Sequence, residues 1–136
     1  MRPAASTRYL LDTHTWLWAI KDSDELSRTA RRILEDSNNE FYLSVASAWE
    51  MAIKTAKGTM ALDPEEDLDV FITRTNLGAG IRTLPISITE VCAVQTLPLH
   101  HHDPFDRLLI AQAVANDLII LSKDRAFSKY EAKVKW

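Results

Sequence analysis

The chain has 136 residues, of which 46% are hydrophobic and 26% charged, so it can bury a core and is too apolar to be disordered. No apolar run reaches the roughly 18 residues that a membrane span needs, and the net charge of −3 argues against a simple basic nucleic-acid binder. The start of the chain lacks a signal-peptide pattern, and the single cysteine, Cys92, excludes an internal disulfide. We expect a cytoplasmic protein with one domain over residues 1–136, in which Cys92 is a small buried hydrophobe.

Strand and helix patterns alternate through the first part of the chain. The predicted elements are a strand over 8–12, helices over 13–22 and 27–38, a strand over 40–44 and a helix over 45–58. Ser27 is a plausible N-cap, and Gly58 ends the last of these helices. Helical spacing of the apolar residues places Trp16 and Trp49 in the core and leaves Trp18 more open.

The same alternation continues to the end of the chain. The predicted elements are a helix from Pro64 to about Leu77, a strand over 81–86, helices over 88–95 and 104–116, and a strand over 118–122. An aspartate followed by proline begins the helices at 64 and 104, and Ser87 with Glu90 forms a capping box. Such alternation predicts an α/β fold with helices on both faces of a mainly parallel sheet.

Four acidic residues end strands or lie near the start of the helices that follow them. They are Asp12, Glu50, Asp106 and Asp124. Because sites in open α/β sheets form outside the carboxyl ends of the strands, all four are expected at one edge of the sheet.

Each acid also has an ordinary structural role open to it. Asp12 can cap a helix, Glu50 can pair with Lys54 one turn on, Asp106 can stabilise the positive end of a helix, and Asp124 can belong to a turn. All four roles together would require a coincidence, since unrelated acids would meet at the same edge.

Clustered carboxylates need a neutralising partner. Two carboxylates about 4 Å apart repel by roughly 4 kcal/mol at an effective dielectric constant of 20. Oxygen ligands select a hard cation, so the sequence predicts Mg²⁺ or Mn²⁺ at this edge. Because Mg²⁺ also takes phosphate oxygens as ligands, the expected substrate is a phosphodiester, attacked by metal-bound hydroxide.

At this point the chain resembles the PIN-domain ribonucleases, specifically the VapC toxins of toxin–antitoxin pairs. The segments that carry the resemblance are YLLDTHTWLW, SVASAWEMAIK, HHDPFDRLLIAQA and LIILSKDRAF, in that order along most of the chain. The resemblance implies a three-layer α/β/α fold with four or five strands, a divalent-metal site and cleavage of RNA. It places the family's acids on Asp12, Glu50, Asp106 and Asp124, and it implies a homodimer and a cognate antitoxin. Asp103 is read first as a helix cap and second as an outer ligand.

The histidines have several interpretations. Adjacent residues cannot all bind one ion, so His100, His101 and His102 are read mainly as a polar loop, with RNA contact or support of the acids open to His101 and His102. His14 lies near Asp12, where proton transfer or phosphate contact is open to it.

Further polar side chains lie close to the predicted site. Thr13, Ser44 and Ser122 can orient carboxylates, and Lys54 and Arg107 can contact phosphate or solvent. Arg28, Arg31 and Arg32 form a basic face on the second helix that can meet RNA or a protein partner.

Other classes of protein use similar acids. A haloacid dehalogenase-type phosphatase needs a second acid two residues after the first, where this chain has His14. A Mg²⁺-binding receiver-like signalling domain fits the acid spacing poorly, although Lys123 suits it. A non-catalytic protein-binding module would be expected to lack some of the four acids.

Overall fold

The structure is a computed structural model that describes residues 6–63 and 65–136. It contains a five-stranded sheet in the order β3-β2-β1-β4-β5, and every neighbouring pair is parallel. The strands are β1 (Arg8–Leu11), β2 (Glu40–Ser44), β3 (Ile81–Leu84), β4 (Ile119–Leu121) and β5 (Val134–Lys135). The predicted α/β fold with four or five strands is therefore confirmed.

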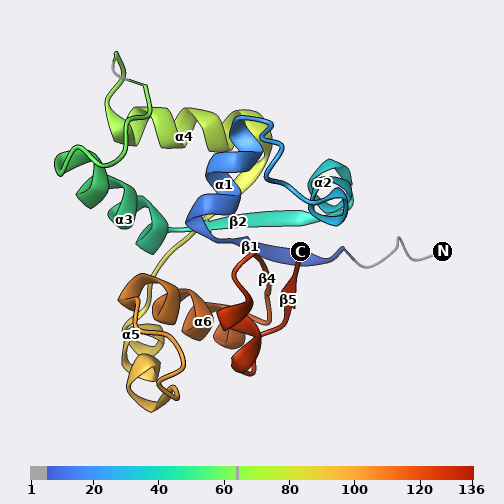
Figure 1. Cartoon of the computed structure of the whole chain (residues 1–136), viewed down its shortest axis with the longest axis vertical. Coiled ribbons are helices and arrows are strands. Elements are labelled where there is room, and N and C mark those ends of the chain that lie inside the picture. Colours follow the sequence, from blue (N-terminus) through green and yellow to red (C-terminus); the bar gives the residue numbers. More distant parts are fainter. Residues whose placement is uncertain (1–5, 64) are drawn as a thin grey trace.

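Helices cover both faces of the sheet and make the three layers of the fold (Figure 1). One side carries α1 (Thr13–Ile20), α2 (Arg28–Glu35), α3 (Val45–Ala56) and α4 (Leu68–Ala79). The other side carries α5 (Ile88–Ala93), α6 (Pro104–Asn116) and the short 3₁₀ helices η1 (Val94–Thr96) and η2 (Arg125–Lys129). None of the helices in the described residues is long and apolar enough to cross a membrane.

Alternating side chains of β1 join two separate cores. Leu11 packs with Trp16 and Met51 on one face, and Leu10 packs with Ile110 on the other. All five side chains are fully buried, and burying a side chain of this size contributes roughly 1.5–3 kcal/mol. Both faces of β1 are thus fixed, which also fixes the residue that follows the strand.

Strand register brings the predicted site residues to one edge. Leu11 is aligned with Leu43 of β2 and with Leu121 of β4. These parallel strands therefore end side by side, and the residues next to their ends share the carboxyl edge of the sheet. Asp12 follows Leu11 directly, and Ser122 follows Leu121.

Helix α4 begins later than predicted. Pro64 lies outside the described residues, but Glu65 and Glu66 are not helical, and the helix starts after Asp67. The Asp63 carboxylate accepts a hydrogen bond from the Glu65 N–H at 3.0 Å, so it closes a turn before the helix instead of capping it.

Two side chains predicted to be buried are exposed. Trp49 on α3 is 60% exposed, and Cys92 on α5 also lies at the surface. Helical spacing identifies an apolar stripe but not the element that covers it. In α5, for example, the buried residue is Glu90 and not its apolar neighbours. Trp16 is fully buried, as predicted.

Candidate metal centre

Asp12 links the ends of β1 and β4. It is the N-cap of α1, where one carboxylate oxygen accepts from the Thr15 N–H at 2.8 Å, and the other oxygen accepts from the Ser122 hydroxyl at 2.5 Å. The side chain is buried, with a residue exposure of 8%. The capping role considered from the sequence is therefore confirmed, and the same carboxylate lies at the carboxyl edge of the sheet.

Glu50 is a buried acid held from two sides. Its Oε1 accepts from the Thr13 hydroxyl at 2.6 Å, and its Oε2 lies 3.0 Å from the Lys54 ammonium nitrogen. The ion pair with Lys54 one turn along α3 was one of the two sequence interpretations. The paired Glu50 is buried, at a residue exposure of 6%.

Asp106 lies in the first turn of α6, behind the cap made by Asp103. The Asp103 Oδ1 accepts from the Phe105 N–H at 2.8 Å and from the Asp106 N–H at 3.4 Å. Burial raises the pKa of Asp106 to about 7, and repulsion from Asp103, Asp12 and Glu50 adds to the rise while His101 opposes it. Asp12 and Glu50 are therefore both close enough to affect Asp106.

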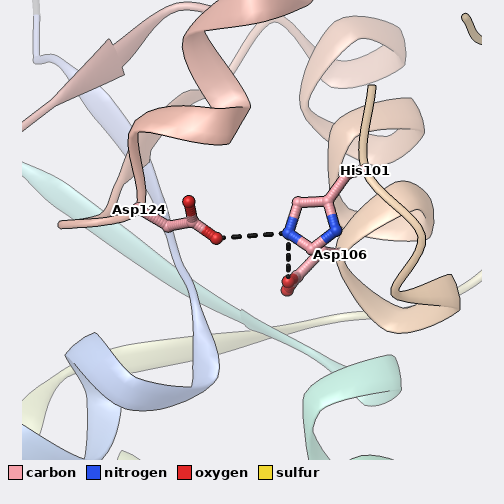
Figure 2. A group of neighbouring side chains, drawn as sticks. All are labelled: His101, Asp106 and Asp124. Carbon is pink, nitrogen blue, oxygen red and sulfur yellow. Dashed lines mark hydrogen bonds and ion pairs between the residues drawn. The ribbon is translucent and has the colours of Figure 1, made fainter. Parts of the chain in front are cut away.

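Asp124 meets the cluster through a histidine. The His101 Nε2 lies 3.0 Å from the Asp106 Oδ2 and 3.2 Å from the Asp124 Oδ2, so the imidazole sits between the two carboxylates (Figure 2). Asp124 is also the N-cap of η2, where its Oδ1 accepts from the Ala126 N–H at 2.9 Å. One ring nitrogen of His101 and one oxygen from each of these acids lie within 4.8 Å of one another.

The other histidines near the site behave differently. His100 packs edge-on against Tyr130 with ring centroids 5.2 Å apart, and His102 is exposed. His14 lies beside Trp18 in a hollow that Asp12 also lines. Sequence alone did not single out His101, because the contact depends on a loop that packs against Tyr130.

Two more of the basic residues considered for contact with RNA, Arg107 and Arg31, have protein partners, as Lys54 does. Arg107 donates to the backbone carbonyls of Val94 at 3.1 Å and Pro98 at 3.0 Å, so it anchors the loop before α6. Arg31 pairs with Asp22, which partly neutralises the basic face of α2.

The residues at the carboxyl edge suit a hard divalent cation. Asp12, Glu50 and Asp106 supply carboxylate oxygens, which Mg²⁺ and Mn²⁺ prefer. Their repulsion of Asp106 is what such a cation relieves, and the His101 Nε2 lies 3.0 Å from the Asp106 Oδ2 while its hydrogen bond goes to Asp124. Carboxylate oxygens therefore suit the predicted kind of ion, but the group of described residues whose ligand atoms lie within 4.8 Å of one another is His101, Asp106 and Asp124, without Asp12 and Glu50.

Fold and site together define an α/β/α domain with an acidic, cation-suited cluster at the carboxyl edge of a parallel sheet. The PIN domain family model matches residues 9–133, and the chain belongs to this family. No curated protein sequence matches it.

Several solved structures share the fold over nearly the whole chain. VapBC2 from Rickettsia felis, bound to a DNA fragment from its promoter, matches at a TM-score of 0.69 and 14% identity, covering 95% of this chain and 98% of that one. FitAcB from Neisseria gonorrhoeae matches at 0.61 and 20% identity over 93% and 95%. A toxin–antitoxin complex from Klebsiella pneumoniae matches at 0.59 and 16% identity over 94% and 96%.

Proposed function

We propose that the chain is a Mg²⁺- or Mn²⁺-dependent endoribonuclease and the VapC-type toxin of a toxin–antitoxin pair. PIN domains are generally nucleases, and chains of similar fold occur in solved toxin–antitoxin complexes. The observation that carries the proposal is that Asp12 and Glu50, from two other elements, lie close enough to Asp106 to raise its pKa, while Thr13, next to Asp12, donates a hydrogen bond to Glu50. We further propose that the protein is a cytoplasmic single domain over residues 1–136.

The chain's own residues prepare this site for a cation and a phosphodiester. In the proposal Asp12, Glu50, Asp106 and Asp124 form the acidic site, and a bound divalent ion would polarise the phosphoryl group and lower the pKa of a water. Ser122 holds the Asp12 carboxylate, and the hydroxyl of Thr13 and the ammonium of Lys54 hold that of Glu50. These contacts orient the two carboxylates before any substrate arrives.

An aromatic ring beside the acids suits a single-stranded RNA. Trp49 precedes Glu50 on α3, is 60% exposed, and packs edge-on against Phe105 with ring centroids 5.1 Å apart. Phe105 in turn precedes Asp106 on α6. A free indole face next to a phosphodiester site can stack on an unpaired base, which is a common mode of RNA recognition.

The proposed partners follow from the charge of the site and from the family. A cognate antitoxin would place a basic side chain among the acids and so occupy the position of the cation. A homodimer is the proposed oligomeric state. A receiver-like signalling domain or a non-catalytic binding module would retain the fold without metal-dependent cleavage of RNA.

Cleavage of total RNA tests the proposal directly. Purified protein is incubated with total RNA with and without Mg²⁺ or Mn²⁺, and the new RNA ends are mapped. We expect metal-dependent cuts that disappear in Asp12→Asn and persist in Asp69→Asn, which removes an exposed acid of α4. Cuts that persist in Asp12→Asn, or no cuts with either metal, would reject the nuclease.

A further inference from the structure

The loop that carries His101 is fixed at its backbone by two side chains. The Tyr130 hydroxyl accepts hydrogen bonds from the N–H groups of His100 at 3.0 Å and His101 at 2.8 Å. The Arg107 guanidinium donates to the carbonyls of Pro98 at 3.0 Å and His101 at 3.4 Å. His101 is therefore held at both of its backbone polar groups.

Hydrogen bonding also sets the orientation of the imidazole. The His101 Nδ1 accepts from the Asp103 N–H at 3.1 Å, and the ring lies against Phe127 with centroids 6.0 Å apart. A neutral imidazole that accepts at Nδ1 carries its proton on Nε2. The single ring N–H then donates to the Asp124 Oδ2, and the same nitrogen lies 3.0 Å from the Asp106 Oδ2 (Figure 2).

The two acids in contact with the His101 Nε2 have different surroundings. The Asp106 side chain is 22% exposed and is repelled by Asp12 and Glu50. The Asp124 side chain is 44% exposed, and its hydrogen bond within the cluster is to the His101 Nε2, although its oxygen lies within 4.8 Å of that of Asp106. Asp124 thus contacts the inner acids through His101.

We propose that His101 is a positioning residue that holds the Asp106 carboxylate at the cation site, and that Asp124 acts by holding His101 and not as a direct ligand of the ion. This inference rests on the proposed metal site. The 3.0 Å contact with the His101 Nε2 fixes the Asp106 Oδ2 and leaves the other oxygen for the cation, and contacts of this kind commonly orient metal-binding carboxylates.

Metal affinity in the absence of RNA tests the role of His101. Mn²⁺ binding to the full chain is measured by electron paramagnetic resonance. We expect His101→Ala to weaken Mn²⁺ binding about 10- to 100-fold and His101→Gln, which keeps an N–H donor, to retain most of it. His102→Ala is the matched control and leaves the affinity unchanged, because His102 is exposed. Unchanged or tighter binding in His101→Ala would overturn the inference, since the ring would then be irrelevant to the ion or compete with it.

A double-mutant cycle and a spectroscopic measurement separate positioning from direct ligation. If Asp124 acts through His101, Asp124→Ala weakens Mn²⁺ binding in the parent chain and adds nothing in the His101→Ala background. Losses that add would make Asp124 a ligand in its own right and refute this part. A directly coordinated ¹⁴N in the electron spin-echo spectrum of bound Mn²⁺ would make His101 a ligand and refute the positioning role; we expect none.

These outcomes are distinct from failure of the proposed nuclease. Mn²⁺ binding with the expected His101 pattern but without RNA cleavage would reject the nuclease and support the inference. RNA cleavage by the parent together with an unchanged Mn²⁺ affinity in His101→Ala would support the nuclease and reject the inference about His101. Thermal melts in EDTA identify any variant that does not fold, and in that case His101→Gln decides: an affinity near that of the parent supports the inference, and one as weak as that of an unfolded chain overturns it.

Discussion

Asp106→Asn should stabilise the metal-free protein at pH 8, although it removes a residue of the proposed site. Burial and neighbouring acids raise the pKa of Asp106 from 3.8 to about 7, so folding opposes its ionisation. Asparagine has nearly the same shape without the charge, and its amide oxygen can still accept from His101.

The size and sign of the effect follow from proton linkage. Between about pH 4 and 7 the folded protein binds more protons at Asp106 than the unfolded chain does, so the free energy of unfolding falls as pH rises through this window. One pKa unit corresponds to about 1.4 kcal/mol, which sets a ceiling of about 4 kcal/mol above pH 7. We expect Asp106→Asn to be about 1–4 kcal/mol more stable than the parent at pH 8, and the gain to shrink towards zero near pH 4.

Urea denaturation in EDTA measures this gain. The parent, Asp106→Asn and the control Asp69→Asn are compared at pH 5 and pH 8, and the control should show no pH-dependent gain because Asp69 is exposed on α4. If Asp106→Asn is less stable than the parent at pH 8, or if its gain is the same at both pH values, the acids are not crowded in the way described.

The remaining predictions concern the cation, the RNA and the protein partner. Mg²⁺ or Mn²⁺ at 100 times its Kd should stabilise the parent by about 2.7 kcal/mol, seen as a higher melting temperature, and Asp12→Asn should lose most of this shift; equal shifts in both would place the ion elsewhere. Trp49→Ala should bind single-stranded RNA roughly 5- to 150-fold more weakly in fluorescence anisotropy, with Trp49→Phe close to the parent; an unchanged affinity together with a smaller oligomer in light scattering would assign Trp49 to a protein interface. A cognate antitoxin peptide should bind Asp12→Asn and Asp106→Asn more weakly in calorimetry, and equal affinities would place its binding site away from the acids.

The fold was predictable because its signals are local and repeated. Short apolar runs alternate with helical patterns, and capping residues such as Ser27, Ser87 and Asp103 mark helix starts that the structure confirms. The late start of α4 was missed because aspartate followed by acids also suits a turn, and the Asp63 carboxylate closes one. Local patterns identify elements well but do not separate a helix cap from a turn just before a helix.

Only the part of the candidate site that is placed by the ends of the strands could be predicted from the sequence. Parallel strands bring Asp12 and the start of α3 to one edge, so convergence of the acids could be expected from topology. The contact between His101 and two of those acids depends instead on Tyr130, some 30 residues away, which holds the loop at its backbone. No spacing rule encodes such a contact, because it arises from tertiary packing. Because Tyr130 holds the loop that carries His101, a substitution at Tyr130 should alter the cation site even though Tyr130 is not one of the acids. A substitution at the exposed His102, next to His101 in the sequence, should not.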